Sequence, residues 1–428
     1  MPVITRRDLM RLLPASMLAG LGLSRLARAD VGANDRKFLF VFAQGGWDPT
    51  WVYAPEFDNQ YVDMPTDDSQ KVSQNGLTWV SSTTRPSVDA FMSTYASRTA
   101  IVNGLEVRSI AHERCRRLLF TGGTDAEAND FPTRLAMGAP SHLPLGNVVL
   151  SGPSYSDSTA SGVVRVGESG QLGTLIDGSC ATGGTQTLRV PSSTLGAPED
   201  AYLLARAQKA AGAASAGAQS RISQAYLTAL QDEPAVTSMA SLLTVNGQDP
   251  LDQMLAAVTL LSNGASRCAT VADLGLNRVT WDSHSQVSIQ STHFELLFAN
   301  LVTLMQTLES TPGTVGATLA DEITVVVWSE MGRYPQLNAS LGKDHWTTTS
   351  MMLVGGGIRG GQVIGGYDSN MGGVPVIPET GASDPDGTSG GVVLQPVHLG
   401  ATLLTLAGLD PVEAFGTDVA PILGLLAQ

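Results

Sequence analysis

The segment 325–366 constrains the fold most strongly, because it places ionisable residues between two strand-like apolar runs. Glu330 ends the first run, and Asp344 with His345 stands just before the second, residues 351–355. Loops at the carboxyl ends of strands gather the reactive groups of α/β proteins. A carboxylate at one strand end and an Asp–His pair near the next therefore predict a metal site. The glycines that follow predict a turn at which backbone comes close to another segment.

The first 29 residues are typical of an export signal that carries a twin-arginine pair, Arg6 and Arg7. The apolar run 12–23 is too short to span a bilayer of about 30 Å, and an Ala-Arg-Ala cleavage site precedes Asp30. An uncleaved amphipathic anchor is the alternative. Twin-arginine signals are addresses read by a receptor, so we expect the bacterial twin-arginine translocase to deliver the protein to the periplasm or beyond. No later run is long enough for a stable membrane span.

The chain is strongly acidic. Its formal charge is −14, and removal of the signal would leave 20 basic and 38 acidic residues, a charge of −18. Such a field repels nucleic acid and anionic lipid, so no nucleic-acid partner is expected. Bound divalent cations would relieve part of this repulsion. The 428 residues allow two or three domains, or one large α/β domain with insertions.

Cysteine use leaves the disulfide state open. Cys115, Cys180 and Cys268 make an odd count for a protein exported to an oxidising compartment. One disulfide with a free thiol and three buried thiols are both compatible with this count. None of the spacings resembles a zinc-finger pair.

Alternating apolar runs and helical patterns predict an α/β fold with a doubly wound, mostly parallel sheet. Lys37–Ala43 is expected to be a central strand that breaks at a Gln-Gly-Gly turn, with Asp48 just beyond it. A strand at 98–105 precedes the loop of His112. The remaining core elements are expected as helices at 112–120, 292–310 and 397–406 and strands at 322–327 and 351–354.

The middle of the chain has a different composition. Residues 125–277 begin with a Gly/Ser-rich stretch, with short strands expected at 147–150 and 162–166, and continue with an alanine-rich helical stretch at 198–232. We interpret this region as an insertion that caps or flanks one domain at 30–428, after the signal at 1–29.

The candidate ligands share one property: each falls in a loop next to a core strand or helix. They are Asp48, His112, Asp282, His284, Glu330, Asp344 and His345. Imidazoles together with carboxylates suit zinc, manganese or iron, whereas carboxylates alone favour magnesium or calcium. Asp282 and His284 are two residues apart, which places both on one face of an extended segment. Arg333 either pairs with Glu330 or holds a substrate oxyanion.

The motifs resemble a known family. The strings WSEMGRYPQLN, DHW and LVGGGIRGGQVIGG, preceded by WDSHS, are similar to GEFGRTP, DHW, LAGGGIxGGxV and FDTHxxQ of the "domain of unknown function 1501" family, which is grouped with alkaline phosphatases and sulfatases. The matching positions are Asp282, His284, Gln286, Glu330, Gly332, Arg333, Pro335, Asp344, His345 and the glycines of 355–361, with His112 and Thr121-Gly122 matching an upstream H and TG. The resemblance spans about residues 38–409.

This resemblance implies an alkaline phosphatase-like core that holds divalent metal ions: zinc, manganese or calcium. Two ions about 4 Å apart would clamp the attacking and leaving oxygens of an in-line displacement. It gives Asp48 a ligand role, places Asp344 and His345 on one ion, and places Asp282 with His284 on the other.

The nucleophile of that superfamily has no clear counterpart. Ser109 lies nearest the expected place, and His112 follows as a possible base. Cys115 lacks the Cys-x-Pro-x-Arg pattern of formylglycine sulfatases, so that route is not expected.

The leading hypothesis is an exported, metal-dependent hydrolase of phosphate or sulfate esters, on a small-molecule or polymer substrate. Its expected catalytic residues are Ser109, His112 and Arg333. The alternative is a non-catalytic exported surface or assembly protein that keeps the fold.

Overall fold

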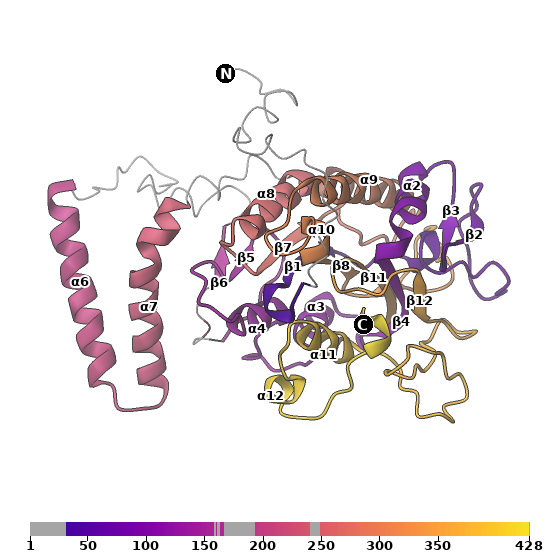
Figure 1. Cartoon of the computed structure of the whole chain (residues 1–428). Coiled ribbons are helices and arrows are strands. Elements are labelled where there is room, and N and C mark those ends of the chain that lie inside the picture. Colours follow the sequence, from indigo (N-terminus) through magenta and orange to yellow (C-terminus); the bar gives the residue numbers. More distant parts are fainter. Residues whose placement is uncertain (1–30, 158–159, 161–162, 167–192, 240–248, 428) are drawn as a thin grey trace, which may run out of the picture.

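The computed structural model describes residues 31–157, 160, 163–166, 193–239 and 249–427 (Figure 1). The export signal and Cys180 lie outside these residues, so the predictions about them stay predictions. Cys115 and Cys268 are buried free thiols. Within the described residues, no helix is both long and apolar enough to cross a membrane.

An eight-stranded sheet forms the centre of the molecule, in the order β12-β4-β11-β8-β1-β7-β5-β6. Its strands are β1 Lys37–Ala43, β4 Thr99–Glu106, β5 Asn147–Val149, β6 Val163–Arg165, β7 Cys268–Asp273, β8 Ile323–Ser329, β11 Thr348–Gly355 and β12 Gln362–Gly365. All pairings are parallel except those of β11, which is antiparallel to both β4 and β8. The expected mostly parallel α/β fold is therefore confirmed.

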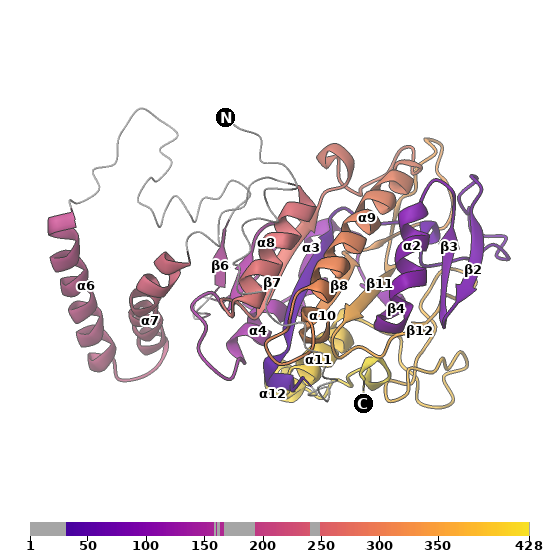
Figure 2. The same ribbon diagram turned by 45° about the horizontal axis from the view of Figure 1, so that its top comes forward.

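Helices cover both faces of this sheet (Figure 2). One face carries α2 Pro86–Tyr95, α8 Pro250–Ser262 and α9 Ile289–Ser310, and the other carries α3 His112–Thr121, α4 Phe131–Met137 and α11 Pro396–Leu406. The remaining elements are α6 Ser193–Ala213, α7 Ala218–Ser238, α10 Leu319–Glu322, α12 Pro411–Phe415, the hairpin β2 Gln70–Gln74 with β3 Leu77–Ser81, and the pair β9 Gly332–Arg333 with β10 His345–Trp346.

Strand β1 is central, as its sequence predicts, and it divides the core in two. Leu39 and Val41 pack into the apolar cluster under α2, α8 and α9. Phe38, Phe40 and Phe42 pack into the cluster under α3, α4 and α11. This division follows from the alternation of side chains along a strand. It explains why the run is apolar at every position.

The antiparallel direction of β11 decides which residues meet. Its first residue, Thr348, pairs with Glu106 at the carboxyl end of β4, and its last, Gly355, pairs with Thr324 at the opposite edge. The residues just before β11 therefore lie beside those just after β4 and β8. The glycine run 355–361 lies at the other edge, where close backbone approach is confirmed, because a Cβ at Gly356 would clash with a backbone oxygen.

The middle region contributes to the core as well as flanking it. Strands β5, β6 and β7 join the sheet, and β7 pairs directly with β1, although the sequence indicated no central strand at β7. Among the described residues of 125–277, the part that stands away from the sheet is the pair α6 and α7 at the side of the molecule (Figure 1). These two helices agree with the expected helical stretch.

Candidate metal centre

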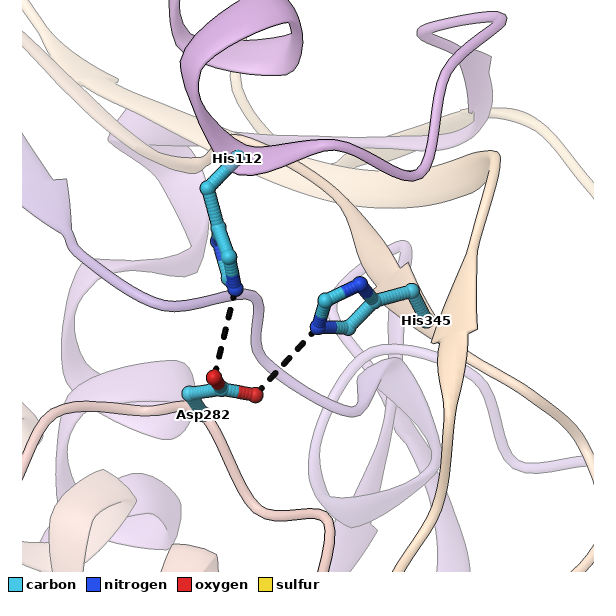
Figure 3. A group of neighbouring side chains, drawn as sticks. All are labelled: His112, Asp282 and His345. Carbon is cyan, nitrogen blue, oxygen red and sulfur yellow. Dashed lines mark hydrogen bonds and ion pairs between the residues drawn. The ribbon is translucent and has the colours of Figure 1, made fainter.

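Four ligand-type side chains converge at the carboxyl edge of the sheet. His112 is the first residue of α3, Asp282 and His284 lie in the segment between β7 and α9, and His345 begins β10. One nitrogen of His112, one nitrogen of His345 and one oxygen of Asp282 all lie within 4.8 Å of one another. Figure 3 shows both rings turned toward the Asp282 carboxylate. We call these four residues the imidazole cluster.

All three imidazoles of the cluster approach Asp282 through the same ring atom. His112 Nε2 lies 3.3 Å from Oδ2, and on Oδ1 the distances are 3.2 Å for His284 Nε2 and 3.3 Å for His345 Nε2. The rings of His112 and His345 are 4.5 Å apart between centroids, as are those of His284 and His345. The carboxylate is thus surrounded by ring nitrogens on both of its oxygens.

The other ring nitrogen of each histidine lies beside a hydrogen-bond acceptor. These acceptors are Glu330 Oε1 for His112 at 2.9 Å, Asp344 Oδ1 for His284 at 3.0 Å, and the Ile110 carbonyl oxygen for His345 at 2.7 Å. An acceptor at Nδ1 holds the ring proton there, which leaves the lone pair on Nε2. Histidine ligands of metal ions are commonly held in this way.

A shared proton or a metal ion would stabilise the place where these ring nitrogens meet. His284 Nε2 and His345 Nε2 are only 2.9 Å apart, and both face the negative oxygen of Asp282. Two lone pairs and a carboxylate at this separation repel one another. Protonation of a ring or a bound metal ion removes that repulsion.

The surrounding charges keep Asp282 ionised. Burial alone would raise its pKa, but hydrogen bonds from His112 and Arg333 outweigh burial and lower the pKa below its usual range. The same bond to Asp282, followed by the bond to Glu330, raises the pKa of His112 to about 9. Burial lowers the pKa of His345, and the nearby Arg333 charge adds to this effect. In the absence of a metal ion, a proton on His112 therefore balances part of the negative charge.

Glu330 supports the cluster from its buried side. Its side chain is fully buried, and its two carboxylate oxygens accept the backbone N–H of Gly45 at 3.0 and 2.9 Å. Gly45 has a φ of +126°, and a Cβ there would meet the backbone nitrogen of Asp282 at 2.6 Å. The glycine lets the end of β1 approach Asp282 closely while Glu330 orients His112. Glu330 is therefore placed to orient His112 and does not itself converge on Asp282.

Arg333 is occupied by the protein itself. Its buried guanidinium donates to Asp282 Oδ1 at 2.8 Å and to the carbonyl oxygens of Gly46 at 2.8 Å and of Lys343 at 3.2 Å. It also donates to the carbonyl oxygen of Gly45. Its carboxylate partner is Asp282 rather than Glu330. These bonds fix the position of Asp282, and they do not fit the expectation that Arg333 holds a substrate oxyanion.

Asp48 and Ser109 are not gathered into the cluster. Asp48 is buried and pairs with Lys343 Nζ at 2.8 Å, so a protein ammonium group already balances its charge. The Ser109 hydroxyl accepts the N–H of Ala111 at 3.2 Å, and it also forms a hydrogen bond with the Cys115 thiol. Ser109 directly precedes Ile110, whose carbonyl oxygen lies against His345. The Ser109 hydroxyl, however, bonds to groups of its own turn and of α3.

Two polar residues at this edge of the sheet were not anticipated. Lys343, the partner of Asp48, follows a glycine in an irregular loop, and no local pattern marks it as buried. Asp273 ends β7 and is nearly fully buried, and this burial raises its pKa to about 6. Its sequence signal was weaker than that of Glu330, because the small residues of CATVA before it mark no strand.

These features define a mostly parallel α/β protein with a candidate metal centre at the carboxyl edge of its sheet. The chain matches the family described as "Protein of unknown function (DUF1501)" over residues 35–415. It therefore belongs to that family, as the motifs predict.

Two solved structures are similar to this chain at low sequence identity. One is a protein in the alkaline phosphatase superfamily from Vibrio parahaemolyticus, at 8% identity over 94% of this chain and 76% of that one, with a TM-score of 0.42. The other is a sulfatase from Pseudoalteromonas sp., at 10% identity over 92% and 72%, with a TM-score of 0.37. No curated protein matches the chain.

We predict that His345→Ala and Asp282→Asn each lower the metal content of the purified protein, because the first removes a ring nitrogen that approaches Asp282 and the second removes the carboxylate charge that all three rings face. Elemental analysis by mass spectrometry after loading with zinc or manganese and dialysis measures this. His142→Ala is the matched control, since His142 pairs with Asp232 at 2.8 Å elsewhere in the molecule. A metal content equal to that of the control would contradict the assignment, provided circular dichroism shows that both variants fold.

Proposed function

We propose that the protein is a metal-dependent hydrolase of phosphate or sulfate esters. The observation that carries this proposal is the convergence of three Nε2 atoms on Asp282 while each Nδ1 has its own acceptor. The residues that would hold the ion are His112, Asp282, His284 and His345. A set this rich in imidazole suits zinc, manganese or iron better than calcium or magnesium.

The charge balance supports a divalent ion. The carboxylates of Asp282, Glu330 and Asp344 face the histidines, and Arg333 is the guanidinium that pairs with one of them. Three negative groups against one positive group leave two negative charges when the rings are neutral. A divalent ion balances this excess without protonating any ring.

The cluster is open to solvent on one side. The side chains of His284 and Asp282 are 48% and 33% exposed, whereas Glu330 and Arg333 behind them are fully buried. A substrate can therefore reach the histidines while the supporting groups stay dry. Buried partners hold Asp282 and His112 in place before substrate arrives, which is the arrangement that lowers the cost of reorganisation during a reaction.

The chemistry that fits this site is ester hydrolysis. A divalent ion bound there would supply Lewis acidity toward the ester oxygens. The attacking group is water: its oxygen forms a bond to phosphorus or sulfur, the bond to the alcohol oxygen breaks, and the alcohol leaves with a proton. Water is favoured over Ser109 because that hydroxyl is held by Ala111 and Cys115.

The rival function is that of an exported surface or assembly protein. Structural zinc sites use four protein ligands, and catalytic zinc sites keep one position open. The imidazole cluster offers four ligand residues, so a closed, non-catalytic ion is the specific alternative. Hydrolytic activity separates the two proposals.

We predict that the metal-loaded protein turns over one class within a panel of aryl phosphates, phosphodiesters and sulfates. Asp282→Asn should lower turnover about 100-fold or more, because it disrupts the centre on which metal binding depends. Ser109→Ala should keep most of the activity. Loss of turnover in Ser109→Ala with metal content unchanged would instead make that hydroxyl the nucleophile. No turnover of any ester by fully loaded protein would reject the hydrolase.

We also propose that the twin-arginine translocase exports the folded protein to the periplasm or beyond, a proposal supported by the sequence of the first 29 residues. Replacing Arg6 and Arg7 together by lysine should stop export, whereas Arg11→Lys, which changes an arginine outside the pair, should not. Fractionation and mass spectrometry of the exported form measure this. The expected N-terminus is Asp30. Equal export of the double variant, or exported protein that keeps its signal, would contradict this proposal.

A further inference from the structure

A polar hollow lies where the loop after β5 meets α3, and its lining includes Glu113, the residue directly after His112 of the imidazole cluster. Its volume is about 420 Å³, and its polar lining includes Arg116, Arg165, Glu113, Ser151, Ser154 and Tyr155. Gln44, the residue directly before Gly45, also lines it. We propose that this hollow binds a second anionic group of the substrate whose ester is cleaved at the cluster. This inference rests on the proposed function.

The position of Arg116 connects the hollow to the cluster. It lies four residues after His112 on α3, so both side chains project from the same face of the helix. Four residues of helix correspond to a rise of about 6 Å. A substrate with two anionic substituents at about this spacing, as on one sugar or aromatic ring, can reach both places.

Arg116 is poised for an anion. Its Nε atom is buried and, among the residues the structure describes, has no hydrogen-bond partner. Its terminal nitrogen pairs with Glu113, whose side chain is 84% exposed, and exposed pairs of this kind contribute little. An anionic ligand can therefore displace Glu113 and satisfy the guanidinium better than the solvated carboxylate does.

The local charge and the rigidity of the hollow also favour anion binding. The whole chain carries −14, yet the two guanidinium groups and the one carboxylate that line this hollow leave it one positive charge in excess. Arg165 donates to the Gly152 carbonyl at 3.2 Å, and the Arg117 guanidinium lies 4.5 Å from the centre of the Tyr155 ring. The wall is therefore formed before a ligand enters, which lowers the entropy cost of binding. Arginine forks match the oxygens of sulfate, phosphate and carboxylate groups.

Calorimetric titration of the metal-loaded full chain tests this site without requiring turnover. Benzene-1,3-disulfonate, with two anionic groups, should bind about tenfold more tightly than benzenesulfonate, with one. Arg116→Gln should remove that preference. Arg114→Gln is the matched control, since it removes the same charge from an exposed position of the same helix outside the hollow. Glu113→Gln should strengthen the preference a few-fold by freeing Arg116.

Kinetics test the place of the hollow in hydrolysis. Arg116→Gln should raise KM about tenfold for an aryl ester with a carboxylate on its ring, with kcat unchanged, and should leave the plain aryl ester unaffected. If the protein prefers the disulfonate but turns over no ester, the anion site is supported and the proposed hydrolase function is rejected. Equal binding of the two sulfonates by the wild type, or equal loss in Arg114→Gln and Arg116→Gln, would overturn the anion site even if esters are cleaved.

Discussion

The antiparallel direction of β11 is the constraint on which the site depends. Parallel strands present their carboxyl ends at one edge of a sheet, and a residue that precedes a parallel strand lies at the opposite edge. Because β11 runs against β4 and β8, His345 ahead of it meets His112 after β4 and Glu330 after β8. The short β9–β10 pair, with His345 opposite Arg333, fixes this meeting point.

The charged groups on the buried side of the cluster hold its side chains in one arrangement. A buried guanidinium or carboxylate is tolerated only with partners, and Arg333 and Glu330 find theirs in Asp282, in His112 and in the backbone of the glycine turn after β1. Each of these groups therefore holds another in one position. The Nε2 atoms of the three histidines are the part of the site whose occupant can change, because they can bind either a proton or a metal ion.

The sequence predicted those parts of the fold that have a local signal. Strands β1, β4, β8 and β11 are apolar runs bounded by turns or by ionisable residues, whereas β7, with the sequence CATVAD, is short and has small residues that mark no strand. The four residues of the cluster were all candidates: Asp282, His284 and His345 belong to close pairs of ligand types, and His112 lies in the loop after the expected strand 98–105. The Asp48–Lys343 pair and the Ile110 carbonyl were not predictable, since each depends on a long-range contact with no local pattern. The resemblance implied two ions and a role for Asp48, whereas the described residues gather one group around Asp282.

We propose a single metal centre, formed by three imidazoles and Asp282 and open to one further ligand. X-ray absorption spectroscopy of the zinc-loaded protein tests it most directly. Elemental analysis should give one ion per chain, and the predicted spectrum shows three imidazole rings at about 2.0–2.1 Å within a shell of at least five light atoms. A second metal scatterer at about 4 Å, or a shell with fewer than three imidazoles, would contradict it.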